Sequence, residues 1–86
     1  MNLRLQLVTV ADTYANAKGQ ARATVSTLVL NGGHVLDGLA GGQADVTTKT
    51  FEKAVAWFDA NWPADLAWPE GVARPSAAAS ADGVAA

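Results

Sequence analysis

The sequence predicts an all-α fold, a small bundle of three to four helices followed by a disordered C-terminal tail. Apolar residues recur at helical spacings, glycine pairs and a proline separate the periodic segments, and no segment shows the alternation of β-branched residues typical of a strand. After residue 68 the composition changes to mostly Pro, Ala, Ser and Gly. We therefore expect one helical domain over residues 1–68 and a flexible tail over residues 69–86.

The first helix is expected from Asn2 to Lys18. Its apolar stripe, with spacings of four, three and four residues, consists of Leu3, Leu7, Val10 and Tyr14. Gly19 follows directly, and glycine readily takes the left-handed conformation with which many helices end. The sequence therefore predicts that this helix stops at Gly19.

A second, shorter helix is expected over residues 21–30, and the Asn-Gly-Gly run at residues 31–33 ends it. Apolar character assigns three residues to its inner side: Val25, Leu28 and Val29. Polar character assigns four to its outer side: Arg22, Thr24, Ser26 and Thr27. The helix thus carries hydroxyl groups and one charge on the side away from the core.

Two further helical segments are expected. Residues 34–40 form a short helix or helical turn, and the glycine pair at residues 41–42 breaks it. Its apolar contacts are Val35, Leu36 and Leu39. Thr47 is a suitable N-cap for the last helix, and Pro63 ends it because the residue before a proline disfavours the helical conformation. The inner face of the last helix contains Phe51, Ala54, Val55, Phe58 and Trp62.

Composition restricts the class of protein. A chain of 86 residues without cysteine has neither disulfides nor cysteine-ligated zinc, and we expect one small cytoplasmic domain. No stretch approaches the roughly 20 apolar residues of a membrane span, and residues 1–4 do not resemble the start of a signal peptide. A single histidine and a glycine pair without a P-loop lysine argue against an enzyme, so we expect no metal site and no cofactor.

The charge distribution bears on nucleic-acid binding. The net charge is -2, whereas proteins that bind phosphates usually have a basic surface. Residues 1–53 hold five basic and four acidic side chains, and residues 54–86 hold one basic and four acidic ones. The acidity therefore lies in the C-terminal part, and the preceding part is slightly basic.

Residues 11–30 fit the helix-turn-helix template, in which the second of two helices enters the major groove of DNA. The template needs a small residue where the helices cross, a turn residue that tolerates positive φ, and an aliphatic anchor on the second helix. Ala15, Gly19 and Val25 stand at these positions, and Leu28 is the next expected inward residue. Lys18 and Gln20 depart from the template, which usually has apolar residues beside the turn glycine.

The same stretch resembles the headpieces of lactose-repressor-type regulators, which have a Thr-Val-Ser run after the turn and then an asparagine. The sequence has this run at residues 24–26 and the asparagine at position 31, while residues 46–55 look like the third helix of those headpieces. About ten extra residues around positions 36–45 interrupt the similarity. The chain also resembles small XRE- or Cro-like regulators of bacteria and phages. The resemblance implies a helix-turn-helix transcriptional regulator, which we expect to be a repressor. The sequence shows no counterpart of the sugar-binding half of a lactose-repressor-type protein, so we expect no sensor domain and no small-molecule effector.

This interpretation predicts specific contacts with double-stranded DNA. Arg22 is expected to contact guanine, Ala23 a thymine methyl group and Thr27 another base edge. The expected phosphate contacts are Lys18, Gln20, Thr24, Ser26, Thr47, Thr48 and Lys49. For each hydroxyl, the alternative is a solvated helix surface or a bond to a preceding carbonyl. For Arg22, the alternative is an exposed surface arginine.

A single copy with few cations should bind DNA weakly, so we expect a homodimer that spans two half-sites. Its expected interface is rich in aromatic residues: Trp57, Phe58, Asn61, Trp62 and Trp68. The alternative is that these side chains build the core of one chain. The alternative function is a protein-interaction module, or an antirepressor of helix-turn-helix shape, which the acidity and the few cations favour.

Overall fold

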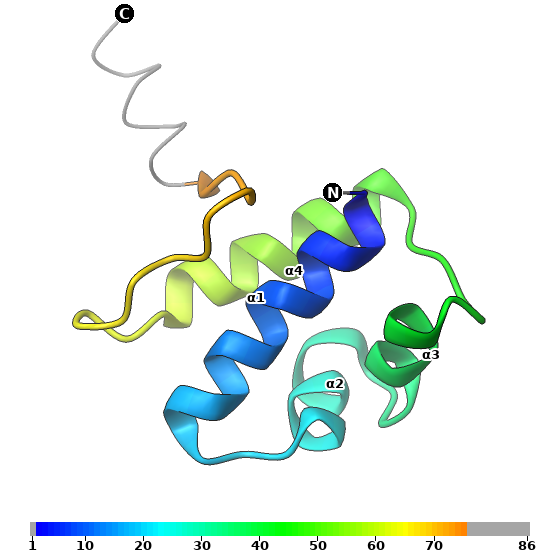
Figure 1. Cartoon of the computed structure of the whole chain (residues 1–86), viewed down its shortest axis with the longest axis horizontal. Coiled ribbons are helices and arrows are strands. Elements are labelled where there is room, and N and C mark those ends of the chain that lie inside the picture. The colour runs from blue at the N-terminus through cyan, green and yellow to red at the C-terminus, as the bar shows by residue number, and fades with distance from the viewer. Residues whose placement is uncertain (1, 76–86) are drawn as a thin grey trace, which may run out of the picture.

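The computed structural model describes residues 2–75, in which four α-helices and no strand occur (Figure 1). The helices are α1 (Leu3–Lys18), α2 (Arg22–Leu30), α3 (Val35–Gly41) and α4 (Thr48–Asn61). The predicted all-α bundle is therefore confirmed. Residues 76–86, which belong to the tail expected over residues 69–86, lie outside the described residues.

The ends of α1 follow from its flanking residues. The side chain of Asn2 accepts a hydrogen bond from the backbone N–H of Leu5, which satisfies a donor that the first turn cannot pair internally. Gly19 ends the helix with φ +66°, and its N–H bonds to carbonyls of the last turn, as predicted. The chain then passes through three residues before α2 begins.

The ends of α4 were also predicted correctly. Thr47 accepts a hydrogen bond from the backbone N–H of Thr50 at 3.2 Å, so it is the N-cap. Trp62 is extended, with ψ 134°, and the helix stops before Pro63. None of the helices found in residues 2–75 is long and apolar enough to cross a membrane.

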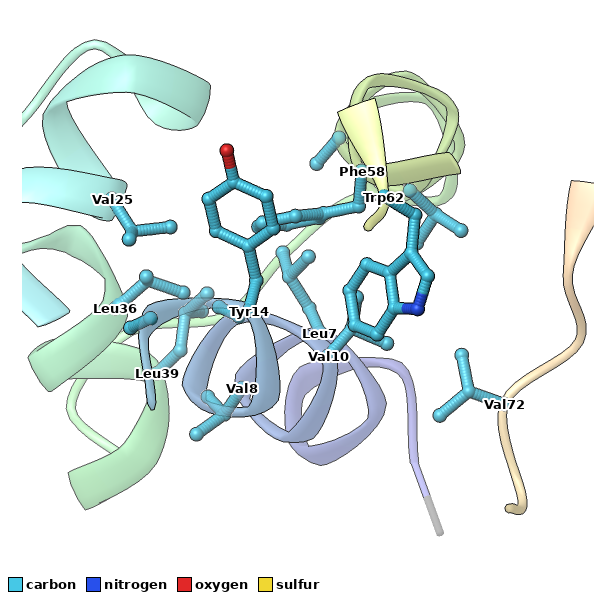
Figure 2. Packing of buried hydrophobic residues seen from close by; sticks show 14 residues of the cluster. Leu7, Val8, Val10, Tyr14, Val25, Leu36, Leu39, Phe58, Trp62 and Val72 are labelled. Atoms are coloured by element: carbon cyan, nitrogen blue, oxygen red, sulfur yellow. The ribbon is translucent and has the colours of Figure 1, made fainter. Parts of the chain in front are cut away.

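Helix α1 packs against α2, α3 and α4, and α2 also contacts each of the other three helices. Figure 2 shows the resulting core, with Val25, Leu36 and Leu39 on one side of α1 and Trp62 and Val72 on the other. The predicted stripe of α1 is largely confirmed. Leu7, Val10 and Tyr14 are buried, and Leu3 is half-buried.

An aromatic cluster joins α1 to α4. The ring of Tyr14 lies 5.5 Å from both Trp57 and Phe58 in edge-to-face orientations, and 6.1 Å from Trp62. Such pairs stabilise a core beyond the burial of their area, by about 0.5–1.5 kcal/mol each. The aromatic side chains of α4 therefore hold it against α1.

Residues 63–75 form no regular element, but they return along α4 and pack on it (Figure 1). Val72 is buried, the indole N–H of Trp68 donates to its carbonyl oxygen at 2.8 Å, and Arg74 pairs with Asp59 at 2.7 Å. The guanidinium of Arg74 also lies over the ring of Trp68. The prediction that the ordered domain ends at residue 68 is therefore wrong for residues 69–75. The indole and the ion pair give residues 69–75 partners that composition alone does not show.

Two apolar residues predicted to face the core are exposed. Leu28 is 53% exposed and Val35 is 37% exposed. In α2 the buried or half-buried residues lie at positions 22, 25, 26, 29 and 30, which is the i, i+3, i+4, i+7 and i+8 spacing of one helix side. Position 28 lies on the opposite side of this stripe, so Leu28 points to solvent.

Candidate nucleic-acid interface

The helix-turn-helix positions are filled in α1, the turn and α2. Ala15 is buried where the helices approach, Gly19 has the positive φ that the turn requires, and Val25 is fully buried. The backbone N–H of Gln20 donates to the carbonyl oxygen of Ala15 at 2.9 Å, which ties the turn to α1. Three of the four template residues thus lie as predicted, and Leu28 does not.

The outer surface of α2 carries small, uncharged side chains. We call the four exposed residues of this surface the α2 face: Ala23, Thr24, Thr27 and Leu28. The hydroxyl of Thr27 donates to the backbone oxygen of Ala23 at 3.1 Å, within the helix. The α2 face therefore presents mainly methyl groups to its surroundings.

Arg22, the expected guanine contact, is bound by two carboxylates. Its Nε and Nη2 donate to the two oxygens of Asp12 at 2.9 and 2.7 Å, and Nη1 donates to Asp37 at 3.1 Å. The hydrogen bonds to Asp12 raise the pKa of Arg22 above its ordinary value, against partial burial and with a further contribution from Asp37. The guanidinium thus stays charged and links α1, α2 and α3. The sequence analysis missed Asp12 and Asp37, which lie 10 and 15 residues from Arg22 along the chain.

Ser26, expected at a phosphate, is fully buried. Its hydroxyl donates to the carbonyl oxygen of Gly32 and accepts from the backbone N–H of Leu36 at 3.1 Å. The prediction that Ser26 contacts a phosphate is therefore wrong. The hydroxyl instead bonds two backbone groups of the connection between α2 and α3. Without it the N–H of Leu36 would be buried without a partner, whereas the Gly32 carbonyl also accepts from the N–H of Val35 at 3.5 Å.

The other residues expected to contact phosphates are exposed, but some of their polar groups already have partners within the chain. Lys18 lies at the end of α1, with its ammonium group 5.9 Å from the centre of the Tyr14 ring. Gln20, Thr24, Thr48 and Lys49 are also exposed. Thr47 is exposed too, but its hydroxyl already caps α4. The start of α4 is therefore less open to an anion than the sequence suggested.

The start of α2 differs from those of α1 and α4. Its N-cap residue, Ala21, has an extended conformation, and no side chain caps the helix. The first backbone N–H groups of an α-helix have no partner within the helix. Those of α2 lie beside the turn, near the exposed Gln20.

The residues expected at a dimer interface belong mostly to the core. Phe58 and Trp62 are 0% and 8% exposed, because both pack against Tyr14, so their assignment to an interface is wrong. Trp57 and Trp68 are half-buried. Asn61 is exposed, and its amide donates to the carbonyl oxygen of Trp57 at 2.8 Å. The aromatic side chains thus mostly build the core of a single chain, which was the alternative to a dimer interface.

Other kinds of site find less support. Across residues 2–75 no three His, Asp or Glu side chains gather as a metal site would require. A pocket of about 330 Å³ lies between α4 and residues 73–75. It is lined by Phe51, Glu52, Val55, Ala73, Arg74 and Pro75. Arg74, its one cation, is already paired with Asp59, so the α2 face remains the main candidate.

No family model, curated protein or solved structure matches the chain.

Proposed function

We propose that the protein binds double-stranded DNA through the α2 face and acts as a small transcriptional regulator. One observation carries this proposal: the turn at Gly19 joins two packed helices, and the second leaves its outer surface uncovered. In helix-turn-helix proteins the second helix lies in the major groove, with its first turns at the base edges. Ala23, Thr24 and Thr27 occupy these turns.

Groups near the turn support phosphate binding. The uncapped N-terminus of α2 offers backbone N–H groups and the positive end of the helix dipole. Lys18 forms no ion pair with any residue that the structure describes, and Gln20 is exposed beside it. These groups lie at the end of the α2 face that would approach the DNA backbone.

The charges predict modest affinity. Arg22 and Arg74 are held by carboxylates, which leaves four basic residues of the described chain without an ion-pair partner in it: Arg4, Lys18, Lys49 and Lys53. Each neutralised phosphate contributes about -0.9 to the slope of log K against log salt. We therefore expect a slope no steeper than about -4 per protomer. A two-fold dimer would double the contacts, with Trp57 and Trp68 as its partly exposed aromatic residues.

The test compares one substitution at two exposed alanines. Ala23 lies on the α2 face and Ala56 on the outer side of α4. Both Ala23→Glu and Ala56→Glu add one negative charge to a helix surface. The full chain is used to select duplexes from a random pool at about 50 mM salt, and binding is followed by fluorescence polarisation. The proposal expects Ala23→Glu to lower affinity at least tenfold and Ala56→Glu to leave it within twofold. Absence of any selected duplex would reject the proposal.

A second candidate is a protein-binding module. The specific observation that favours it is the exposure of Leu28 and Val35 beside an uncharged helix surface, together with the neutralisation of Arg22. A photo-reactive residue at position 28 distinguishes the two in whole cells. A protein adduct of one mass that Ala23→Glu removes and Ala56→Glu retains would support this candidate. Adducts with DNA alone would reject it.

A further inference from the structure

We infer that the α2 face selects DNA through the C5-methyl groups of thymine, an inference that rests on the proposed function. The face ends in the methyl groups of Ala23, Thr24, Thr27 and Leu28. It contains no amide, amine, guanidinium or carboxylate. In the major groove, apolar contact with the C5-methyl group is what marks thymine, whereas guanine, adenine and cytosine are read by hydrogen bonds from longer polar side chains.

Few side-chain donors on α2 are free to read bases by hydrogen bonds. Arg22 has the fork that guanine requires, but Asp12 and Asp37 occupy Nε, Nη1 and Nη2. Turning this fork toward a base would break three charged hydrogen bonds and leave two carboxylates without their partner. The Thr27 hydroxyl donates within the helix. The Thr24 hydroxyl is the one hydroxyl of the α2 face without a hydrogen bond in the described chain, so methyl contact is the main chemistry left to the other three side chains.

The spacing of the methyl groups sets the expected target. Ala23 and Thr27 are four residues apart, and so are Thr24 and Leu28, so the α2 face has two parallel rows. Four residues rise by about 6 Å, and successive base pairs by about 3.4 Å. Each row thus spans about two base pairs, which favours adjacent A·T pairs over isolated ones.

Charge at the edge of the face fits DNA as its occupant. The face has no carboxylate to repel phosphates, and Lys18 and the uncapped start of α2 add positive potential at its N-terminal end. The carboxylates of Asp12 on α1 and Asp37 on α3, which bind α2 through Arg22, are neutralised in part by this arginine. A duplex can therefore approach the methyl groups with its backbone on the basic side.

The experiment removes the thymine methyl groups without changing base pairing. A selected duplex is made with thymine and again with deoxyuridine, and the dissociation constants of the full chain are compared. Loss of one contacted methyl group should weaken binding about fourfold, which is equivalent to about 0.8 kcal/mol. Equal affinity for the two duplexes would overturn the inference while the DNA proposal stands. If no duplex binds at all, the proposed function fails first and the inference with it.

Two variants of one residue separate contact from DNA shape. Thr27→Val keeps a methyl group and removes the hydroxyl, so the thymine-to-uracil ratio should be retained. Thr27→Ser keeps the hydroxyl and removes the methyl group. The thymine-to-uracil ratio should therefore fall about fourfold, which is the factor expected for one methyl contact. A ratio that is large and unchanged in both variants would mean that shape rather than contact discriminates the duplexes, and would overturn the role of Thr27.

Discussion

The side of the bundle where α4 meets α1 and the side formed by α2 and α3 are stabilised in different ways. The first side packs aromatic rings: Tyr14, Trp57, Phe58, Trp62 and Trp68. The second is rich in glycine and small residues, and two polar groups connect its elements. Arg22 links α2 to α1 and α3, and the Ser26 hydroxyl joins α2 to the backbone at residues 32 and 36.

This difference explains which surface is free. Large rings bury much area from a single helix surface, so α4 and residues 63–75 cover each other. Small residues allow α2 to be fixed through one narrow stripe, and more than half of Leu28 stays in solvent outside that stripe. Because α2 is attached through polar groups and a narrow stripe, the α2 face stays uncovered. The following predictions test this contrast, beginning with the largest effect.

Phe58→Ala should have the largest effect on stability. Phe58 is fully buried, with ring contacts to Tyr14 and Trp57 at 5.5 and 5.3 Å. Truncation of a buried phenylalanine costs about 3–5 kcal/mol, which is comparable to the whole stability of many domains of this size. Urea unfolding followed by tryptophan fluorescence measures the loss. A cost below about 1.5 kcal/mol would show that the aromatic side does not dominate the fold.

Ser26→Ala should cost less, and its effect should be local. Without the hydroxyl, the N–H of Leu36 loses its partner and the carbonyl of Gly32 keeps only the 3.5 Å bond from the N–H of Val35, at about 1–3 kcal/mol. Amide hydrogen exchange should accelerate in α2 and α3 more than in α4. The control is Thr24→Ala, an exposed change on the same helix that should stay within about 0.5 kcal/mol. Equal costs for the two variants would contradict the structural role of Ser26.

The same contrast explains what the sequence could and could not predict. The helix ends at Gly19, Thr47 and Pro63 depend on local chemistry, and all three were predicted correctly. The rotation of α2 was not, because assigning each residue by its own polarity placed Leu28 inside and Ser26 outside. A helix only nine residues long has one buried stripe, and Val25 and Val29 together with the i, i+3, i+4 spacing place position 26 in it.

Long-range pairs were beyond the reach of sequence reasoning for another reason. The partners of Arg22 and Arg74 lie 10 to 15 residues away, on other elements, and only the packing of the bundle brings them together. Composition alone therefore made residues 69–75 look like a tail and Arg22 like a free cation. In the candidate site, Thr24 and Thr27 were predicted to lie on the outer side of α2, and both are exposed.

Val72→Ala tests whether residues 69–75 belong to the aromatic side. Val72 is buried although it lies in a segment without helix, and the loss of two buried methyl groups at about 0.8 kcal/mol each predicts a cost of about 1–2 kcal/mol. The fluorescence of Trp68 should shift to longer wavelength, since its indole bonds to the Val72 carbonyl. Ala73→Gly, at the exposed next residue, is the control. An unchanged unfolding midpoint in Val72→Ala would mean that this segment does not contribute.

Gly19→Ala should have a smaller effect, through the backbone alone. An added Cβ meets no atom within 4 Å, but φ is +66°, a conformation that costs other residues about 1 kcal/mol. Gly19→Asn should cost less, because asparagine tolerates this conformation better than alanine. The two unfolding midpoints in urea measure the difference. Equal costs for alanine and asparagine would show that the positive φ at the turn is not the constraint.

Leu28→Gln should have the smallest effect on folding, and this prediction separates the two sides most directly. Leu28 is mostly exposed, so the change should alter stability by less than about 0.5 kcal/mol. Leu36→Ala, eight residues later and 1% exposed, should cost about 2–5 kcal/mol as the matched buried leucine. The same Leu28→Gln protein should lose affinity for the selected duplex, since a methyl-bearing side chain is replaced by an amide. A variant that keeps its stability and loses its affinity would show that Leu28 serves DNA binding and not folding. A destabilised variant would show that Leu28 contributes to the core.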